Sequence, residues 1–159
     1  MRIFLDTANI DQIREAARLG VISGVTTNPS LMSKVGRSDY REAVLEICAI
    51  VGGPISAEVL SQEPEEIIEE ARGIASWAPN VVVKIPVTPA GLEAISVLAK
   101  EQIKVNMTLC FSLNQALLGA LAGAAYVSPF VGRLDDAGHD GMGLVADIVD
   151  VYERYDLST

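Results

Sequence analysis

Six short runs rich in β-branched residues recur along the 159 residues, and a longer amphipathic segment follows each of the first five. The runs are RIFLD, SGVTT, PISAEV, NVVVKIPV, IKVNMTL and AAYVSPF. We expect each strand to be apolar on both sides of its pleat, with helices covering one face and core the other. A repeated strand and helix order, with no linker or low-complexity break, predicts an α/β protein with a parallel sheet.

The segments between these runs have the apolar spacing of helices and begin with residues that favour helix N-termini. They are residues 10–19 capped by Asn9, 39–51 capped by Ser38, 63–77 with Pro64 in the first turn, 90–100 preceded by Thr88 and Pro89, and 113–123 preceded by Ser112.

Polar residues gather where the predicted strands end. They are Asp6, Thr26, Asn28, Glu58, Lys84, Asn106, Thr108, Ser128 and Arg133. In a (β/α) barrel, side chains at the C-terminal ends of the strands converge on one mouth, where the active site forms. The simpler alternative is that each strand runs into a polar loop, but a loop does not explain Glu58 and Lys84 inside apolar runs.

The composition limits the kind of partner that the protein can have. Half of the residues are apolar, which is enough for one sizeable core, so we expect a single domain over residues 1–159. Acidic residues outnumber basic ones 21 to 12, for a formal charge of −9. This balance argues against nucleic acids and anionic membranes, which are polyanions. No signal peptide or membrane-spanning run is apparent, and we expect a cytoplasmic protein.

No feature of the sequence predicts a metal site. Cys48 and Cys110 stand among apolar residues without zinc-type spacing and are expected to be reduced core residues. The run DDAGHD, residues 135–140, fits no standard metal motif and is expected to be a solvated loop.

Lys84 is the most informative single residue, because three valines precede it in NVVVKIPVT. A lysine among apolar groups loses hydration, which disfavours its ammonium form and makes a neutral, nucleophilic amine accessible. The structural alternative is a buried ion pair between Lys84 and Glu58.

Six motifs resemble the signatures of one enzyme family, in the right order and over the whole chain. They are FLDTAN, GVTTNPSL, SAEV, VVKIPVT, VNMTL and YVSPFVGRLDD. Together they resemble the small transaldolases, a family of (β/α)8 TIM barrels that form a Schiff base through the lysine of the fourth strand. The resemblance also implies no cofactor, sugar-phosphate substrates and a homo-oligomer, since family members form pentamers or decamers.

The resemblance implies a role for each site residue. Lys84 would be the Schiff-base nucleophile, and Asp6 the acid/base at the substrate C4 hydroxyl. Glu58, with Thr108, would hold the water that relays protons. The substrate-binding residues would be Asn28, Asn106 and Ser128 at the dihydroxyacetone hydroxyls, Thr26 and Phe130 beside them, and Arg133 at the phosphate.

The implied reaction belongs to the pentose phosphate pathway. A dihydroxyacetone unit would pass from fructose 6-phosphate or sedoheptulose 7-phosphate to an aldose phosphate. The sister fructose-6-phosphate aldolases share the fold and the lysine but carry glutamine where this chain has Glu58 and tyrosine where it has Phe130. These two positions favour a transaldolase, and an aldolase remains the alternative.

The chain departs from the family pattern at YERYDLST, where the family begins its seventh strand. We therefore expect about six of the eight β/α units, as in a shortened barrel. That strand normally supplies a serine and a second phosphate-binding arginine, so a further alternative is an inactive fragment that needs a partner chain.

Overall fold

A computed structural model describes all of residues 1–159 and contains the six parallel strands that the sequence predicts. The strands pair in chain order within one sheet. They are β1 (Ile3–Asp6), β2 (Ile22–Thr26), β3 (Ile55–Glu58), β4 (Val81–Pro86), β5 (Val105–Cys110) and β6 (Tyr126–Pro129). The first and last strands each have one paired neighbour, so the sheet is an open half-barrel of the TIM-barrel kind.

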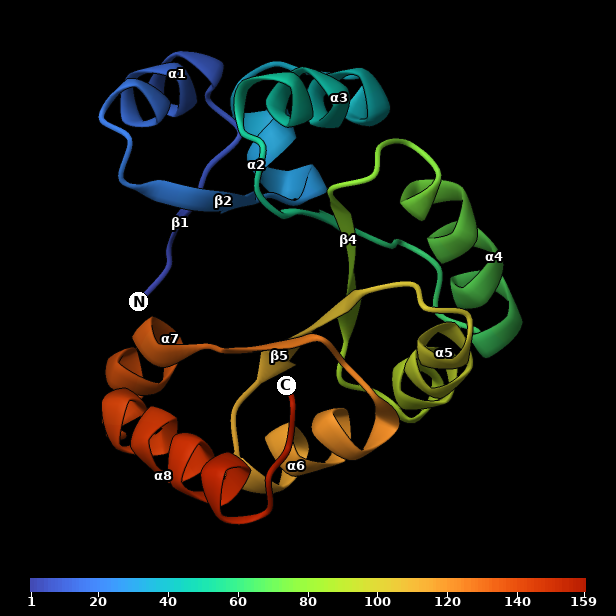
Figure 1. Ribbon diagram of the computed structural model, residues 1–159, viewed down its shortest axis with the longest axis vertical. Coiled ribbons are helices and arrows are strands. Elements are labelled where there is room, and N and C mark those ends of the chain that lie inside the picture. The colour runs from blue at the N-terminus through green and yellow to red at the C-terminus, as the bar shows by residue number, and fades with distance from the viewer.

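Eight helices accompany the sheet and lie around the outside of the strands (Figure 1). They are α1 (Ile10–Arg18), α2 (Pro29–Lys34), α3 (Tyr40–Ile50), α4 (Pro64–Ala75), α5 (Pro89–Lys100), α6 (Leu113–Ala122), α7 (Val131–Asp136) and α8 (Gly141–Arg154). None of these helices has the length and apolar character needed to cross a bilayer.

The predicted N-terminal caps of the helices are confirmed, except the cap of α3. Side-chain oxygens of Asn9, Thr88 and Ser112 accept backbone N–H bonds at the starts of α1, α5 and α6. Helix α3, however, is capped by Asp39 and not by Ser38, because the Asp39 carboxylate accepts from the Glu42 amide at 2.9 Å. Either residue type can cap a helix, so spacing alone left the start uncertain by one residue.

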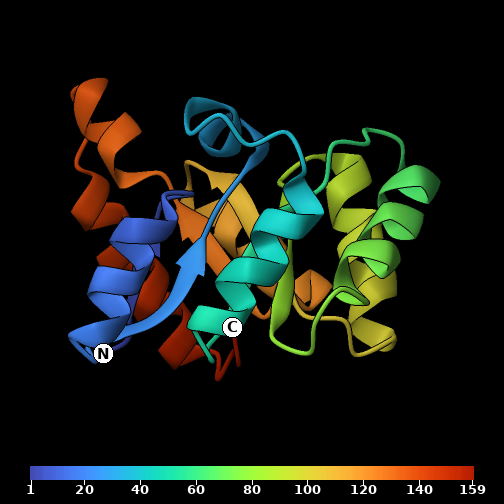
Figure 2. The ribbon, with the colours of Figure 1, turned by 90° about the horizontal axis from the view of Figure 1, so that it is seen from above.

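The short helices α2 and α7 follow β2 and β6 directly and were not predicted. Both lie at the same end of the molecule, to which the strands deliver their C-terminal residues (Figure 2). The expectation of a solvated loop over residues 135–140 is wrong in part. Asp136 ends α7, and Asp140 caps α8 by accepting from the Gly143 amide at 2.8 Å.

The two faces of the sheet differ, which corrects the expectation of strands apolar on both sides. Side chains of one parity face the helices and form the main core, including Val25, Ile55, Val83 and Met107. The other parity lines the inside of the curved sheet and is polar toward the C-terminal ends. Its polar members are Asp6, Thr26, Ser56, Glu58, Lys84, Asn106, Thr108 and Ser128.

Aromatic side chains bring the two free edges of the half-barrel together near the N-terminal ends of the strands. The Phe4 ring of β1 meets the Tyr126 ring of β6 edge to face, with centroids 6.3 Å apart. The Arg2 guanidinium lies 5.9 Å from the Tyr126 ring centroid, in a cation–π contact. Gly24 in β2 makes room for this cluster, because a Cβ there would lie 2.4 Å from Phe4 Cε1.

Candidate functional site

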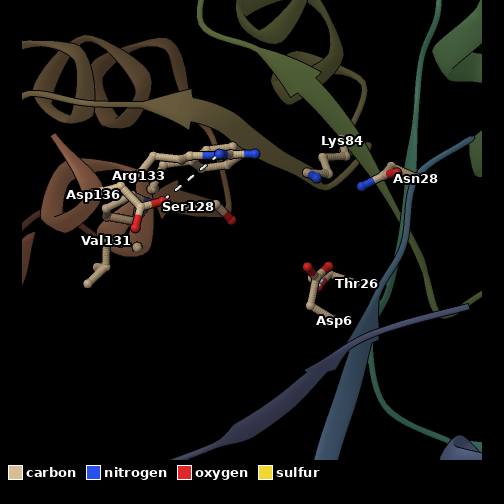
Figure 3. Close-up of a pocket in the computed structure, with 11 residues that line it drawn as sticks. Asp6, Thr26, Asn28, Lys84, Ser128, Val131, Arg133 and Asp136 are labelled. Carbon is tan, nitrogen blue, oxygen red and sulfur yellow. Dashed lines mark hydrogen bonds and ion pairs between the residues drawn. The ribbon is translucent and has the colours of Figure 1, made fainter. Parts of the chain in front are cut away.

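A cavity of about 600 Å³ opens at the C-terminal ends of the strands. Figure 3 shows Asp6, Thr26, Asn28 and Lys84 on one side of it and Ser128, Arg133 and Asp136 on the other. Pro129, Phe130, Val131 and Gly132 complete the lining. Seven of the ten residues predicted for the site therefore share one cavity, while Glu58, Asn106 and Thr108 are not among the residues that line it.

Lys84 is buried and paired. It is 6% exposed, and its Nζ lies 3.2 Å from Oε2 of Glu58. The two residues are directly opposite each other in the β3 and β4 register, which points both side chains to the inside of the sheet. The ion pair considered as a structural alternative is thus present, and it places a carboxylate within reach of the lysine amine.

Asp6 and Thr26 form the opposite part of the cavity wall. They are register partners at the ends of β1 and β2, and the Thr26 hydroxyl donates to Asp6 Oδ1 at 2.8 Å. Asp6 is exposed to solvent. The hydrogen bond fixes the carboxylate direction and leaves its second oxygen for another partner.

Asn106 is the centre of a buried hydrogen-bond chain across three strands. Its Nδ2 donates to Ser56 Oγ at 3.1 Å, and its Oδ1 accepts from Ser128 Oγ at 2.8 Å. Sequence reasoning missed Ser56. The period of two along PISAEV, which puts Ser56 on the same face as Glu58, was the available signal.

Thr108 lies in the interior of the protein. It is fully buried, and its hydroxyl has no hydrogen-bond partner among the protein atoms. Its register partner is Pro86, two residues beyond Lys84 on the same face of β4. An unpartnered hydroxyl in the interior is costly, so a water molecule is a natural partner for it.

The remaining predicted residues lie on loops and helix starts. Asn28 caps α2 by accepting from the Leu31 amide at 2.9 Å. The Phe130 ring packs edge to face on Phe111, with centroids 5.4 Å apart. The Arg133 side chain is 76% exposed, and its Nη1 lies 4.0 Å from Oδ2 of Asp136. It extends across the cavity toward Lys84 (Figure 3). It is a cation available to an anionic ligand.

Tyr40 lies behind the Glu58 backbone, and no sequence pattern singled it out. The Glu58 N–H donates to the Tyr40 hydroxyl at 2.8 Å. Burial raises the pKa of Tyr40 well above its usual value, and the nearby Glu58 and Glu70 charges act in the same direction. The phenol is therefore neutral over the ordinary pH range.

The groups with metal-binding potential are dispersed. No three His, Cys, Asp or Glu side chains converge in the geometry of a metal site. Cys110 is buried in the core and Cys48 is partly buried, both as free thiols, and burial raises the pKa of each.

Comparison with known proteins extends over the whole chain. Residues 3–159 match the profile of a family described as "Transaldolase/Fructose-6-phosphate aldolase". A "Probable transaldolase" of Dehalococcoides mccartyi is 64% identical over 160 residues, and its Desulforudis audaxviator counterpart is 60% identical over 159. In both cases the match covers 100% of this chain and 74% of the relative.

A more distant relative carries the same description. The "Probable transaldolase" of Methanococcus maripaludis is 56% identical over 159 residues, with 74% of its length covered. Among solved structures, orotidine 5'-phosphate decarboxylase from Pyrococcus horikoshii aligns with a TM-score of 0.36 and 13% identity, over 79% of this chain and 88% of that one. That alignment is too weak to bear on function.

Proposed function

The chain belongs to the transaldolase/fructose-6-phosphate aldolase family, and on this premise we propose that it acts as a Schiff-base transaldolase. The substrates would be sugar phosphates. A dihydroxyacetone unit would move from fructose 6-phosphate or sedoheptulose 7-phosphate to an aldose phosphate, with no cofactor. The names of the relatives support this activity.

The observation that carries the proposal is the surroundings of Lys84. One buried lysine lines a cavity, 3.2 Å from a carboxylate that can accept its proton, and a second carboxylate, Asp6, lines the same cavity. A deprotonated amine attacks ketones, and the two carboxylates supply the acid and base that the subsequent steps need.

The first half of the reaction makes the Schiff base. The Lys84 amine adds to the C2 carbonyl of fructose 6-phosphate, and the carbinolamine loses its hydroxyl as water to give an iminium ion. Glu58 supplies the proton for that water, through a water molecule that the unpartnered Thr108 hydroxyl helps to hold. Asp6 then takes the proton of the C4 hydroxyl, and the C3–C4 bond breaks.

The electron pair of that bond neutralises the iminium ion and leaves an enamine on Lys84. The departing aldehyde is glyceraldehyde 3-phosphate. In the second half, the enamine carbon attacks the aldehyde of an acceptor, Asp6 returns the proton to the new hydroxyl, and water hydrolyses the iminium ion to release the product ketose.

Substrate binding follows from the polar lining of the cavity. Asn28 and Ser128, which line the cavity, are assigned to the dihydroxyacetone hydroxyls together with Asn106, which does not line it but accepts from Ser128 Oγ at 2.8 Å. Thr26 and Phe130 are assigned to substrate binding as well. Arg133 is assigned to the phosphate, since a guanidinium binds paired phosphate oxygens in a protein whose net charge of −9 repels anions.

An acceptor-dependence assay tests the proposal. Fructose 6-phosphate with erythrose 4-phosphate is expected to give sedoheptulose 7-phosphate, whereas fructose 6-phosphate alone turns over slowly. Rapid release of dihydroxyacetone without an acceptor would contradict the transaldolase assignment and support the sister aldolase. The Phe130→Tyr variant is expected to shift the balance toward release, and Tyr155→Phe, a change at an exposed ring, serves as the control.

The cellular setting is part of the same proposal. These substrates belong to the pentose phosphate pathway, and we assign the protein to the cytoplasm. A homo-oligomer is supported by exposed apolar side chains on the outer helices, including Leu118, Leu121 and Met142. Size-exclusion chromatography with light scattering tests this, and a monomer would contradict it.

A further inference from the structure

The backbone of Glu58 is paired with β4 but has no partner on the β2 side, at the position where its side chain meets Lys84. Pairing between β2 and β3 ends at Thr26 and Ser56, after which the Thr27 amide bonds to the Ser56 carbonyl. In a continued parallel ladder, the next bond would run from the Glu58 amide to the β2 chain. That chain turns away, because Asn28 and Pro29 begin α2.

Side chains of two helices accept the hydrogen bonds of the amides that β2 does not reach. The Glu58 amide donates to the Tyr40 hydroxyl of α3 at 2.8 Å. The Glu70 carboxylate of α4 accepts from the Leu60 amide at 3.0 Å and the Ser61 amide at 2.8 Å. The Val59 amide donates to the Lys84 carbonyl at 3.1 Å. Every amide from residue 58 to 61 is therefore hydrogen-bonded, although the segment after Glu58 leaves the sheet.

The Tyr40 hydroxyl is itself held in place. Its ring packs edge to face on Trp77, with centroids 5.9 Å apart, and it begins α3 directly after the Asp39 cap. The side chain has only two rotatable bonds, so packing fixes the oxygen position at little entropic cost. A neutral phenol can accept from the amide without placing a third negative charge beside Glu58 and Glu70.

We propose that Tyr40 is a positioning residue for Glu58. Its hydroxyl takes the place of β2 at the Glu58 amide while Glu70 holds the next amides, of Leu60 and Ser61, so that the Glu58 carboxylate stays beside Lys84. This role rests on the proposed function, because a displaced Glu58 matters only if it serves the Lys84 chemistry. Tyr40 itself is not among the residues that line the cavity.

The test compares two tyrosine variants. Tyr40→Phe removes the hydroxyl from the Glu58 amide. Tyr152→Phe is the matched control, because the Tyr152 hydroxyl donates to a backbone oxygen, that of Ala116, at 2.7 Å and lies on α8, outside the residues that line the cavity. Circular dichroism selects conditions under which both variants are folded. Glu70→Gln, which keeps one acceptor oxygen, is a second and milder variant.

Two readouts follow. Amide hydrogen exchange by NMR is expected to be about tenfold faster at Glu58 in Tyr40→Phe, and unchanged there in Tyr152→Phe. Timed incubation with fructose 6-phosphate, quenched with borohydride, gives the rate of adduct formation by intact mass. The limiting rate is expected to fall about tenfold in Tyr40→Phe, with half-saturation within about twofold of wild type, because the binding groups are untouched.

Each outcome has a distinct meaning. Unchanged exchange at Glu58, or an unchanged limiting rate, would overturn the positioning role. An equal rate loss in Tyr152→Phe would also overturn it, since the effect would then be general destabilisation. A wild-type protein that forms no adduct would contradict the proposed function, and exchange at Glu58 would still decide whether Tyr40 holds this amide.

Discussion

Replacing Glu58 by glutamine leaves the Lys84 ammonium in the interior without its counter-charge. The two charged atoms are 3.2 Å apart, so their attraction is about 5 kcal/mol at an effective dielectric constant of 20. Loss of hydration on burial offsets most of this attraction. Breaking a buried pair costs about 3 to 5 kcal/mol, and because the Glu58 side chain is 20% exposed we expect a smaller loss of about 2 kcal/mol.

Urea denaturation at one fixed protein concentration measures this loss. With a denaturant slope of about 1 to 3 kcal/mol per molar, the unfolding midpoint of Glu58→Gln is expected to fall by about 1 M. The double variant Glu58→Gln/Lys84→Met is expected to recover most of the stability, because it leaves no unpaired buried charge.

The matched control for this experiment is Glu46→Gln. Glu46 pairs with Arg14 at 3.0 Å and Arg37 at 2.6 Å on the surface of the protein, where an ion pair contributes less than about 1 kcal/mol. The ion pair between Lys84 and Glu58 would not form in solution if Glu58→Gln were no more destabilising than Glu46→Gln. The same conclusion would follow if the double variant were no more stable than Glu58→Gln.

Two further perturbations test the fold around the site. In Gly24→Ala, the new Cβ would meet Phe4 Cε1 at 2.4 Å and the Pro54 carbonyl at 2.5 Å, so a loss of about 2 kcal/mol is expected in urea, and an unchanged midpoint would contradict the close packing. The raised pKa of Tyr40 makes stability depend on alkaline pH. Above about pH 10 the unfolded tyrosine loses its proton while the folded one keeps it, so stability falls as pH rises, and Tyr40→Phe is expected to remove this contribution.

Much of the fold could be predicted from local pattern. The six β-branched runs correctly predicted the six strands, and the polar residues at their ends correctly predicted which end of the sheet carries the cavity. Both features depend on residues that are neighbours in the sequence. The family prediction is also confirmed. Ser56, deeper on the inner face, was missed, because the apolar runs were taken as buried on both sides and the period of two that relates Ser56 to Glu58 was not followed.

The support for Glu58 could not be predicted in the same way. Tyr40 is 18 residues from Glu58 in the chain and Glu70 is 10 residues from Leu60. They meet the end of β3 and the segment after it only when α3 and α4 pack on the sheet. A hydrogen bond between a side chain and a distant backbone amide produces no repeating pattern in the sequence, so it cannot be predicted from periodicity. The same holds for the Phe4–Tyr126 contact, which depends on the curvature of the whole sheet.

The central claim is that Lys84 is the nucleophile, and the position of the trapped adduct tests it most directly. The protein is incubated with fructose 6-phosphate, reduced with borohydride and mapped by peptide mass spectrometry. The reduced three-carbon unit is expected on Lys84, and Lys84→Met is expected to abolish it. An adduct on the exposed Lys100 or Lys104, or an undiminished adduct in Lys84→Met, would contradict the assignment of the buried lysine.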